Sequence, residues 1–316
     1  MIYFIYGEDS YRSKKKLEDI ILGYKEKNRS GINLVYFDTI AETFKNFFGN
    51  LQVNSMFAEK KLIILKNVFE SKEFQTNFLE NIQNLEKAED IVIVYQDNSP
   101  DQRTKLFKEL QKKSKCQEFG FLSTVALKKW IVEEFVRPAS KHSEAKINPE
   151  AVDLLISFVG SDLWRMSNEI NKLSNYKKNS VIKKEDVALL VKPGIDNDIF
   201  KTIESLVSGE KKQALTLLHK HLEDGDNALY LLSMIAYQFR NILIIKELQE
   251  EQTPYNLVAK KSGLHPFVVQ KSYYLCNQFS IEKLKKIYRK IFQVDSDIKT
   301  GKIEAEIALD LLLSEI

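Results

Sequence analysis

Short apolar runs alternate with longer amphipathic stretches over residues 1–120, and this alternation restricts the fold more than any other feature of the sequence. Runs such as Leu62–Leu65 and Ile91–Val94 contain no polar residue, as is typical of strands buried on both faces. Strands that alternate with helices form a parallel sheet covered on both sides. The predicted strands are 2–6, 33–37, 61–65, 91–95 and a weaker 115–119, and the predicted helices are 10–27, 41–49, 71–87 and 101–113.

The strand pattern stops near residue 122, and helical patterns fill the rest of the chain. Asn148-Pro149 is an N-cap followed by a proline at the first helical position, and Pro193-Gly194 reads as a linker. The sequence therefore predicts an α/β domain at 1–140, a small all-α domain at 141–192 and an all-α domain at 193–316. The helices expected there are 125–139, 148–158, 162–175, 183–191, 229–248, 255–261, 265–277, 280–299 and 302–315.

The turn after the first strand, Gly7-Glu8-Asp9-Ser10, lies where a phosphate-binding loop would lie. Such a loop needs several glycines and a Lys-Ser/Thr pair, whereas this turn is short and has one glycine. Glu8 and Asp9 would repel phosphate, but they suit the positive end of a helix. The chain is therefore expected to keep the scaffold of a nucleotide-binding domain without its chemistry.

The end of the third strand supports the same interpretation. Lys66 stands where an aspartate would be needed to hold magnesium, and a cation there would repel the metal. The alternative is a parallel sheet that never bound nucleotide.

Two adjacent apolar residues, Met56 and Phe57, lie in the segment between the second helix and the third strand. A connecting turn of this kind should be polar, and neighbouring residues do not both face one core. One interpretation is that they are exposed and fill a pocket of a partner protein. The other is that one or both cap the sheet.

Composition excludes several classes of function. The formal net charge is +3, from 47 basic and 44 acidic residues, which argues against nucleic-acid binding driven mainly by electrostatic attraction. The basic stretches 14–16 and 112–115 either contact phosphates or form solvated helix faces. The start of the chain has no signal-peptide pattern, and no continuous apolar stretch reaches the roughly 18 residues of a membrane span.

Residue types that carry catalysis or bind metals show no recognisable arrangement. Cys116 and Cys276 are far apart and are expected to be reduced thiols. His219 and His221 are two residues apart, so they do not share a helix face as metal ligands would. No metal, cofactor or catalytic residue is therefore predicted.

Polar residues interrupt the most apolar helix of the C-terminal region at Gln238 and Arg240. Buried polar groups need partners. Arg240 is therefore expected to form an internal pair or a helix-packing contact in an oligomer.

Segments along the whole chain resemble one known family, the delta subunit of the bacterial DNA polymerase III clamp loader. The order and spacing of these segments carry the resemblance: Tyr6–Asp9, Ser55–Phe57, Gly160–Leu163, Glu169–Leu173, Asp198–Phe200, Gln238–Arg240, Leu264–Phe267 and Asp297–Gly301. The resemblance implies an AAA+-type domain that binds no nucleotide, followed by a helical lid and a helical collar.

The resemblance also implies a function. The family binds the ring-shaped sliding clamp and holds it open for loading onto primed DNA during replication. Its clamp-binding element is a pair of adjacent apolar residues, which maps onto Met56 and Phe57 after Ser55; Met56 replaces the usual leucine.

The partners implied are the clamp, the ATPase and stator subunits bound through the collar, and primer-template DNA within the assembled loader. The chain would be a cytoplasmic subunit of a DNA-directed DNA polymerase, a nucleotidyltransferase, without an active site or cofactor of its own. Two alternatives remain open: an AAA+ ATPase with an atypical phosphate loop, or a stator-type subunit of the same loader.

Overall fold

The computed structural model describes residues 1–28, 31–53, 60–136, 146–177 and 180–316. The chain divides into two compact units, Met1–Phe121 and Leu122–Ile316. The finer division into three domains, with boundaries at 140 and 192, stays a prediction.

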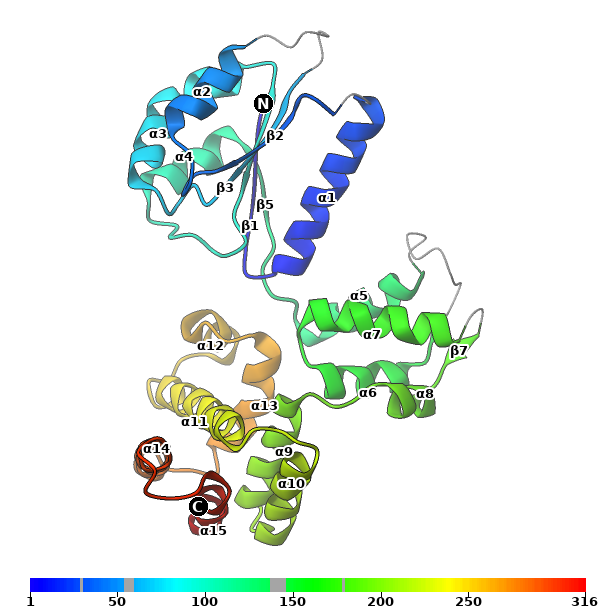
Figure 1. Cartoon of the computed structure of the whole chain (residues 1–316), viewed down its shortest axis with the longest axis vertical. Helices are drawn as coiled ribbons and strands as arrows, with labels where there is room; N and C mark the ends of the chain where they lie inside the picture. Colours follow the sequence, from blue (N-terminus) through cyan, green and yellow to red (C-terminus); the bar gives the residue numbers. More distant parts are fainter. Residues whose placement is uncertain (29–30, 54–59, 137–145, 178–179) are drawn as a thin grey trace. The chain divides into compact units, whose positions relative to one another are not determined.

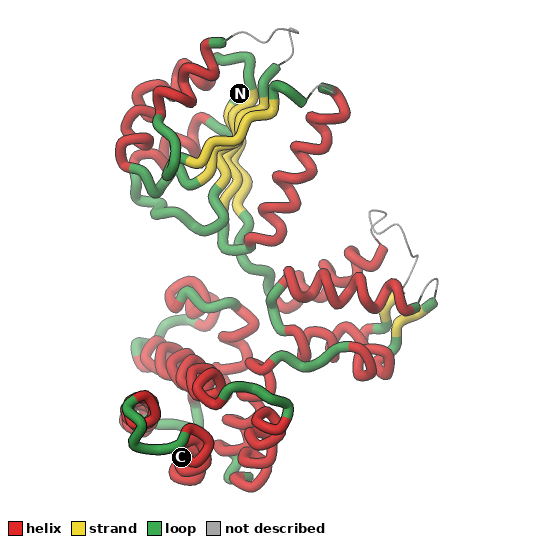
Figure 2. The backbone as a smooth tube through the Cα atoms, viewed as in Figure 1, coloured by secondary structure: helices red, strands yellow, loops and turns green. Residues whose placement is uncertain are grey.

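The first unit is an α/β domain in which strands and helices alternate (Figures 1 and 2). Its sheet has the strand order β2-β3-β4-β1-β5, and every neighbouring pair is parallel. The elements are β1 (Ile2–Tyr6), α1 (Ser10–Lys27), β2 (Leu34–Asp38), α2 (Phe44–Gln52), β3 (Leu62–Lys66), α3 (Lys72–Lys87), β4 (Ile91–Tyr95), α4 (Lys105–Lys113) and β5 (Lys115–Glu118).

Both faces of this sheet are covered, as the apolar runs predict. Figure 1 shows α1 on one face and α2, α3 and α4 on the other. Along β3, Leu62 and Ile64 join the cluster under α1, whereas Ile63 and Leu65 join the larger cluster under the other helices. All four of these side chains are fully buried. The predicted parallel sheet is confirmed.

Two helices begin later than their sequence pattern indicates, because threonines cap them. The hydroxyl of Thr43 accepts a hydrogen bond from the backbone N–H of Asn46, and that of Thr104 accepts one from Phe107. An N-cap residue lies outside the helix. Consequently α2 and α4 start at Phe44 and Lys105 rather than at 41 and 101.

The second unit opens with a small helical region. Its elements are α5 (Thr124–Val136), β6 (Lys146–Ile147), α6 (Pro149–Val159), α7 (Leu163–Tyr176), β7 (Val181–Ile182) and α8 (Lys184–Leu190). The prediction that strands stop near residue 122 is wrong, because β6 and β7 pair in parallel. Each strand has two residues, too few for a period to show in the sequence. The backbone N–H of Asn148 donates to Ile182 O at 3.0 Å, so the pair also ties the start of α6 to the start of α8.

The Pro193-Gly194 linker leads into seven helices within the described residues. They are α9 (Ile195–Val207), α10 (Lys211–Glu223), α11 (Ala228–Glu250), α12 (Tyr255–Ser262), α13 (Pro266–Cys276), α14 (Ile281–Lys299) and α15 (Ala305–Glu315). The linker is held in place: Gly194 N donates to Phe158 O at 2.7 Å, and the Arg165 guanidinium donates to Lys192 O at 2.7 Å.

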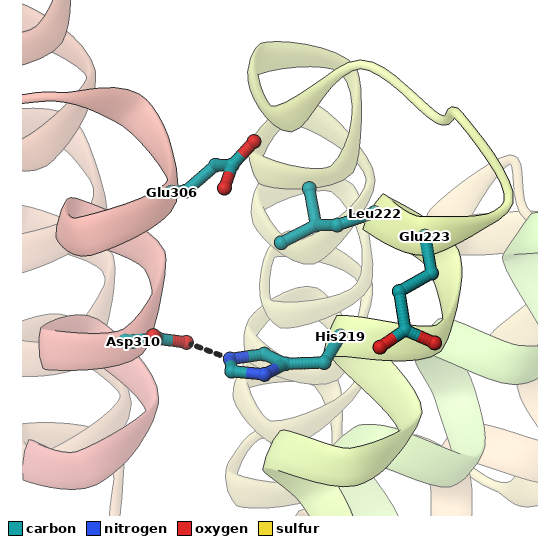
Figure 3. A pocket seen from close by; sticks show the side chains of 5 residues that line it. All are labelled: His219, Leu222, Glu223, Glu306 and Asp310. Carbon is teal, nitrogen blue, oxygen red and sulfur yellow. Dashed lines mark hydrogen bonds and ion pairs between the residues drawn. The ribbon is translucent and has the colours of Figure 1, made fainter.

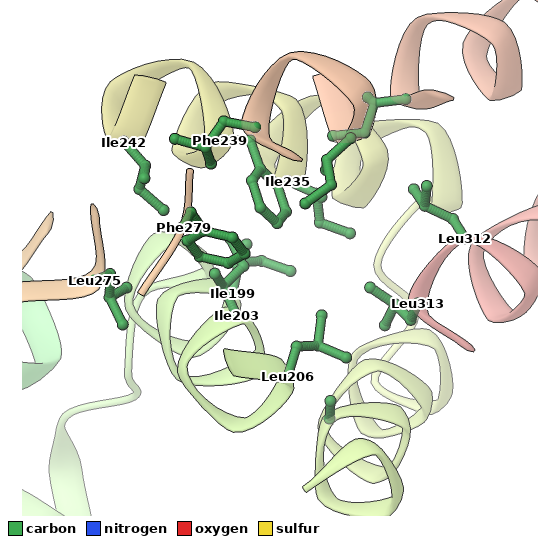
Figure 4. Packing of buried hydrophobic residues seen from close by; sticks show 14 of the residues in the cluster. Ile199, Ile203, Leu206, Ile235, Phe239, Ile242, Leu275, Phe279, Leu312 and Leu313 are labelled. Carbon is green, nitrogen blue, oxygen red and sulfur yellow. The ribbon is translucent and has the colours of Figure 1, made fainter. Parts of the chain in front are cut away.

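Helix α11 lies at the centre of this helical core. Figure 4 shows its Ile235, Phe239 and Ile242 together with side chains from α9 and α15. By length and composition, α11 is also the one helix in the described part of the chain that is long and apolar enough to cross a membrane. Half of its most apolar window is buried in the protein, which is the pattern of a core helix.

Candidate functional site

The turn between β1 and α1 is closed by the chain segments that follow β4 and β5. Gly7 has a φ of +135°, and its N–H donates to Asn98 O at 3.1 Å. Asp9 N donates to Phe119 O at 2.9 Å. A Cβ atom on Gly7 would lie 2.3 Å from Phe119 O. The single glycine of the turn therefore allows two backbone segments to approach closely.

At the N-terminal end of α1, the side chains of Asp9 and Arg12 form hydrogen bonds with each other and with the backbone. The carboxylate of Asp9 is buried, and it accepts hydrogen bonds from Arg12 N at 3.0 Å and from Arg12 Nε at 2.5 Å. The same guanidinium donates to Gly120 O. Glu8 is exposed beside them. An anion at this helix end would have to displace the Asp9 carboxylate, which already caps the helix.

The carboxyl end of β3, two strands away from β1 at the same edge of the sheet, presents a cation. Lys66 is exposed and lies in register with Asp38 of β2 and Tyr95 of β4. Hydrogen bonds from the Asn67 side chain and the Ile40 backbone lower the pKa of Asp38, and the first of these is 2.9 Å long. This carboxylate is therefore already hydrogen-bonded to the turns that follow β2 and β3. Within the described residues, no three His, Cys, Asp or Glu side chains are grouped as metal ligands.

Ser55, Met56 and Phe57 lie outside the described residues. On one side of them, α2 ends at Gln52 and Val53 is exposed; on the other side, Lys60 is exposed and β3 begins at Leu62. Helix α2 is anchored by aromatic packing, because Phe44 and Phe47 contact Phe74 of α3 at ring-centroid distances of 5.3 and 5.8 Å. The first half of α2 is thus packed against α3.

The two predicted assembly residues of α11 differ in environment. Gln238 is buried, and its Oε1 has no hydrogen-bond partner among the described residues. Arg240 is exposed, with its guanidinium 5.4 Å from the ring of Tyr237, itself 36% exposed. Arg240 makes no ion pair within the described residues, so the internal pair considered for it is not found there.

A surface pocket of about 260 Å³ lies between α10 and α15 (Figure 3). Its side chains are His219, Leu222, Glu223, Glu306 and Asp310. His219 Nε2 lies 2.7 Å from Asp310 Oδ1, whereas His221 Nδ1 lies 2.8 Å from Asp226 Oδ2. The two histidines thus face different carboxylates, in agreement with their spacing in the sequence.

Both cysteines are free. Cys116 is exposed, and Cys276 is buried. Burial raises the pKa of the Cys276 thiol to about 11, so this side chain is an unreactive part of the core.

An α/β domain with a five-stranded parallel sheet, a first β–α turn closed by its own backbone, and a helical region after it define the class of protein. Family models narrow this class further. The model for "DNA polymerase III, delta subunit" matches residues 3–119, and the model for "DNA polymerase III delta subunit, C-terminal domain" matches residues 196–316. The chain belongs to the DNA polymerase III delta subunit family, as its sequence predicts.

Relatives match over nearly the full length. The chain is 24% identical over 325 residues to "DNA polymerase III subunit delta" of Bacillus subtilis (strain 168), covering 100% of this chain and 92% of the relative. It is 22% identical over 311 residues to "Probable DNA polymerase III subunit delta" of Aquifex aeolicus (strain VF5), covering 93% and 85%. Its fold is similar to the solved structure of "Bacillus subtilis DNA clamp loader delta protein (YqeN)", with a TM-score of 0.77, 23% identity and coverage of 99% and 94%.

Proposed function

We propose that this chain is a non-catalytic clamp-loader subunit of DNA polymerase III, which binds the sliding clamp and opens it for loading onto primed DNA. Membership of the delta subunit family supports this function, as does the similarity in fold to a clamp loader delta protein of Bacillus subtilis. The observation that supports the non-catalytic part is the closed turn at Gly7, where Asp9 N already donates to the Phe119 carbonyl and the Asp9 carboxylate pairs with Arg12.

The proposed roles divide between the ends of the chain. Met56 and Phe57, after Ser55, bind the clamp from the α/β domain. The collar at 193–316, with Gln238 and Arg240 on α11, binds the ATPase and stator subunits. Primer-template DNA is reached within the assembled loader, in the cytoplasm. The lid at 141–192 joins the two.

Capture of the purified chain on the immobilised sliding clamp of the same organism tests the proposal directly. We expect retention without nucleotide, because the turn that would bind nucleotide is closed. If the chain is not retained under conditions where a known clamp-binding protein is retained, clamp binding is contradicted.

Two other functions make different predictions. An ATPase with an atypical phosphate loop would require Asp9 and Arg12 to leave the helix end before phosphate could enter. A stator-type subunit would join the loader but would not bind the clamp alone. Cysteine-rich zinc sites are common in such subunits, and the described residues offer no metal-binding group.

The isolated chain should neither bind nor hydrolyse ATP. The amide of Asp9 and the first turn of α1 are already hydrogen-bonded within the protein, and Lys66 repels a magnesium ion at the end of β3. Titration with a fluorescent ATP analogue and magnesium checks binding, with an ATPase subunit of the loader as positive control. Micromolar magnesium-dependent binding, or turnover lost on replacing residues 7–13, would overturn this expectation.

Charge reversal at Arg240 should weaken assembly but leave clamp binding unchanged. Arg240 is exposed on α11 beside Tyr237, so Arg240→Glu removes a cation from the surface proposed to meet the other subunits. Breaking one interfacial charge contact typically weakens binding by roughly tenfold or more. Co-purification with the ATPase subunits measures the effect, and Arg103→Glu is the control, because Arg103 is an exposed arginine in the first unit, outside the proposed collar. Equal recovery of both variants would rule out the role of Arg240.

A further inference from the structure

Lys61 is a buried cation next to the segment proposed to bind the clamp. It directly precedes β3, and only 6% of the residue is exposed. Its ammonium donates hydrogen bonds to the carbonyl oxygens of Asn50 and Val53. Among the described residues, no carboxylate forms an ion pair with it. The backbone at the end of α2 is therefore the partner that compensates its burial.

These two carbonyls belong to the part of α2 that needs a donor. The last four carbonyl groups of a helix lack intrahelical partners, and the C-terminal end carries a partial negative charge. Asn50 lies in the last turn of α2, and Val53 is its C-cap. A lysine side chain at such an end can satisfy the carbonyls and interact favourably with the helix dipole. Lys61 thus stabilises the point where the chain leaves α2.

The backbone around Lys61 is fixed to three other parts of the domain. Lys61 N donates to Asp90 Oδ1 at 2.8 Å, just before β4. The Tyr24 hydroxyl of α1 donates to Lys60 O at 2.7 Å, and Leu62 N donates to Asn33 O at 2.9 Å. Because the sheet fixes the backbone of Lys61, the hydrogen bonds of its side chain connect the end of α2 to the sheet.

We propose that Lys61 is a positioning residue for clamp binding: by holding the carbonyls of Asn50 and Val53, it sets where the chain leaves α2 toward Met56 and Phe57. The proposal rests on the clamp-binding function proposed above. Lys61 itself need not touch the clamp. By fixing the end of α2 in the free chain, Lys61 reduces the entropic cost of ordering this segment when the complex forms.

Lys61→Met tests this role, because it keeps the length and apolar stem but removes the ammonium. We expect clamp affinity to fall roughly three- to tenfold. Lys61→Arg, which can still donate to both carbonyls, should recover most of the affinity. Lys66→Met, an exposed lysine at the other end of the same strand, is the matched control and should bind like the parent. Hydrogen exchange should show faster exchange at 44–53 in Lys61→Met and no change in α3.

A double-mutant cycle separates positioning from general stability. In a Met56→Ala background, Lys61→Met should cost clearly less affinity than in the parent, because both changes act on one binding element. Equal losses in the two backgrounds, or parental affinity of Lys61→Met, would overturn the proposal. Should Lys61→Met fail to fold, Lys61→Gln gives the same comparison. A parent chain that does not bind the clamp at all instead contradicts the proposed function itself.

Discussion

Replacing Met56 and Phe57 together by alanine should lower the affinity for the sliding clamp by about 30- to 1,000-fold. Truncation of apolar residues at the centre of an interface typically costs about 2–4 kcal/mol, which corresponds to this range of affinity. Surface plasmon resonance on immobilised clamp measures the change. The proposal requires both side chains to be exposed in the free chain, so the variant should keep the melting temperature of the parent.

The alternative, that these residues cap the sheet, predicts the opposite pair of results. Truncating two core side chains costs a similar free energy, but in folding rather than in binding. The variant would then melt much earlier. Val53→Ala is a suitable control, because Val53 is 65% exposed at the end of α2 and belongs to the same connection. A double variant that binds as tightly as the Val53→Ala control contradicts the clamp-binding role.

The strands of the α/β domain could be predicted because burial on both faces leaves an unambiguous pattern. A run such as Ile91–Tyr95 contains no charged residue, and its predicted bounds agree with β4. Boundaries fail where one hydrogen bond decides them, as at Thr43 and Thr104. Strands β6 and β7 could not be predicted, because a two-residue strand is defined by its partner and has no period of its own.

The candidate site shows the same limit. Composition of the turn alone indicates that it does not suit phosphate, since Glu8 and Asp9 are acidic. The groups that close the turn, however, are the backbone of Phe119 and Gly120, more than a hundred residues away in sequence. The burial of Lys61 could not be predicted either, because a lysine at the start of a strand normally marks an exposed end. Two features of the sequence could have indicated it. Lys61 immediately precedes a fully apolar run, and the helix before it has no glycine at its C-terminal end.

Gly7→Ala should destabilise the first unit by roughly 2–5 kcal/mol, because it combines backbone strain with a steric clash. The φ of +135° is unfavourable for alanine, and the new Cβ would meet Phe119 O at 2.3 Å. Phe119 is held there by its own hydrogen bond to Tyr6 O at 2.7 Å, so it cannot easily move away. For a unit of this size, such a loss lowers the melting temperature by about 10 °C or more.

Gly120→Ala is the matched control for this prediction, because a Cβ at Gly120 would meet no atom within 4 Å. The chain also contains an internal reference. Its two tryptophans, Trp130 and Trp164, both lie in the second unit, so tryptophan fluorescence reports unfolding of that unit. Hydrogen exchange in β1 and β5 reports the first unit. We expect Gly7→Ala to accelerate exchange in these strands while the tryptophan transition stays in place. If Gly7→Ala and Gly120→Ala exchange at the same rate, the close approach of residues 7 and 119 does not hold the turn closed, and the main physical argument against nucleotide binding fails with it.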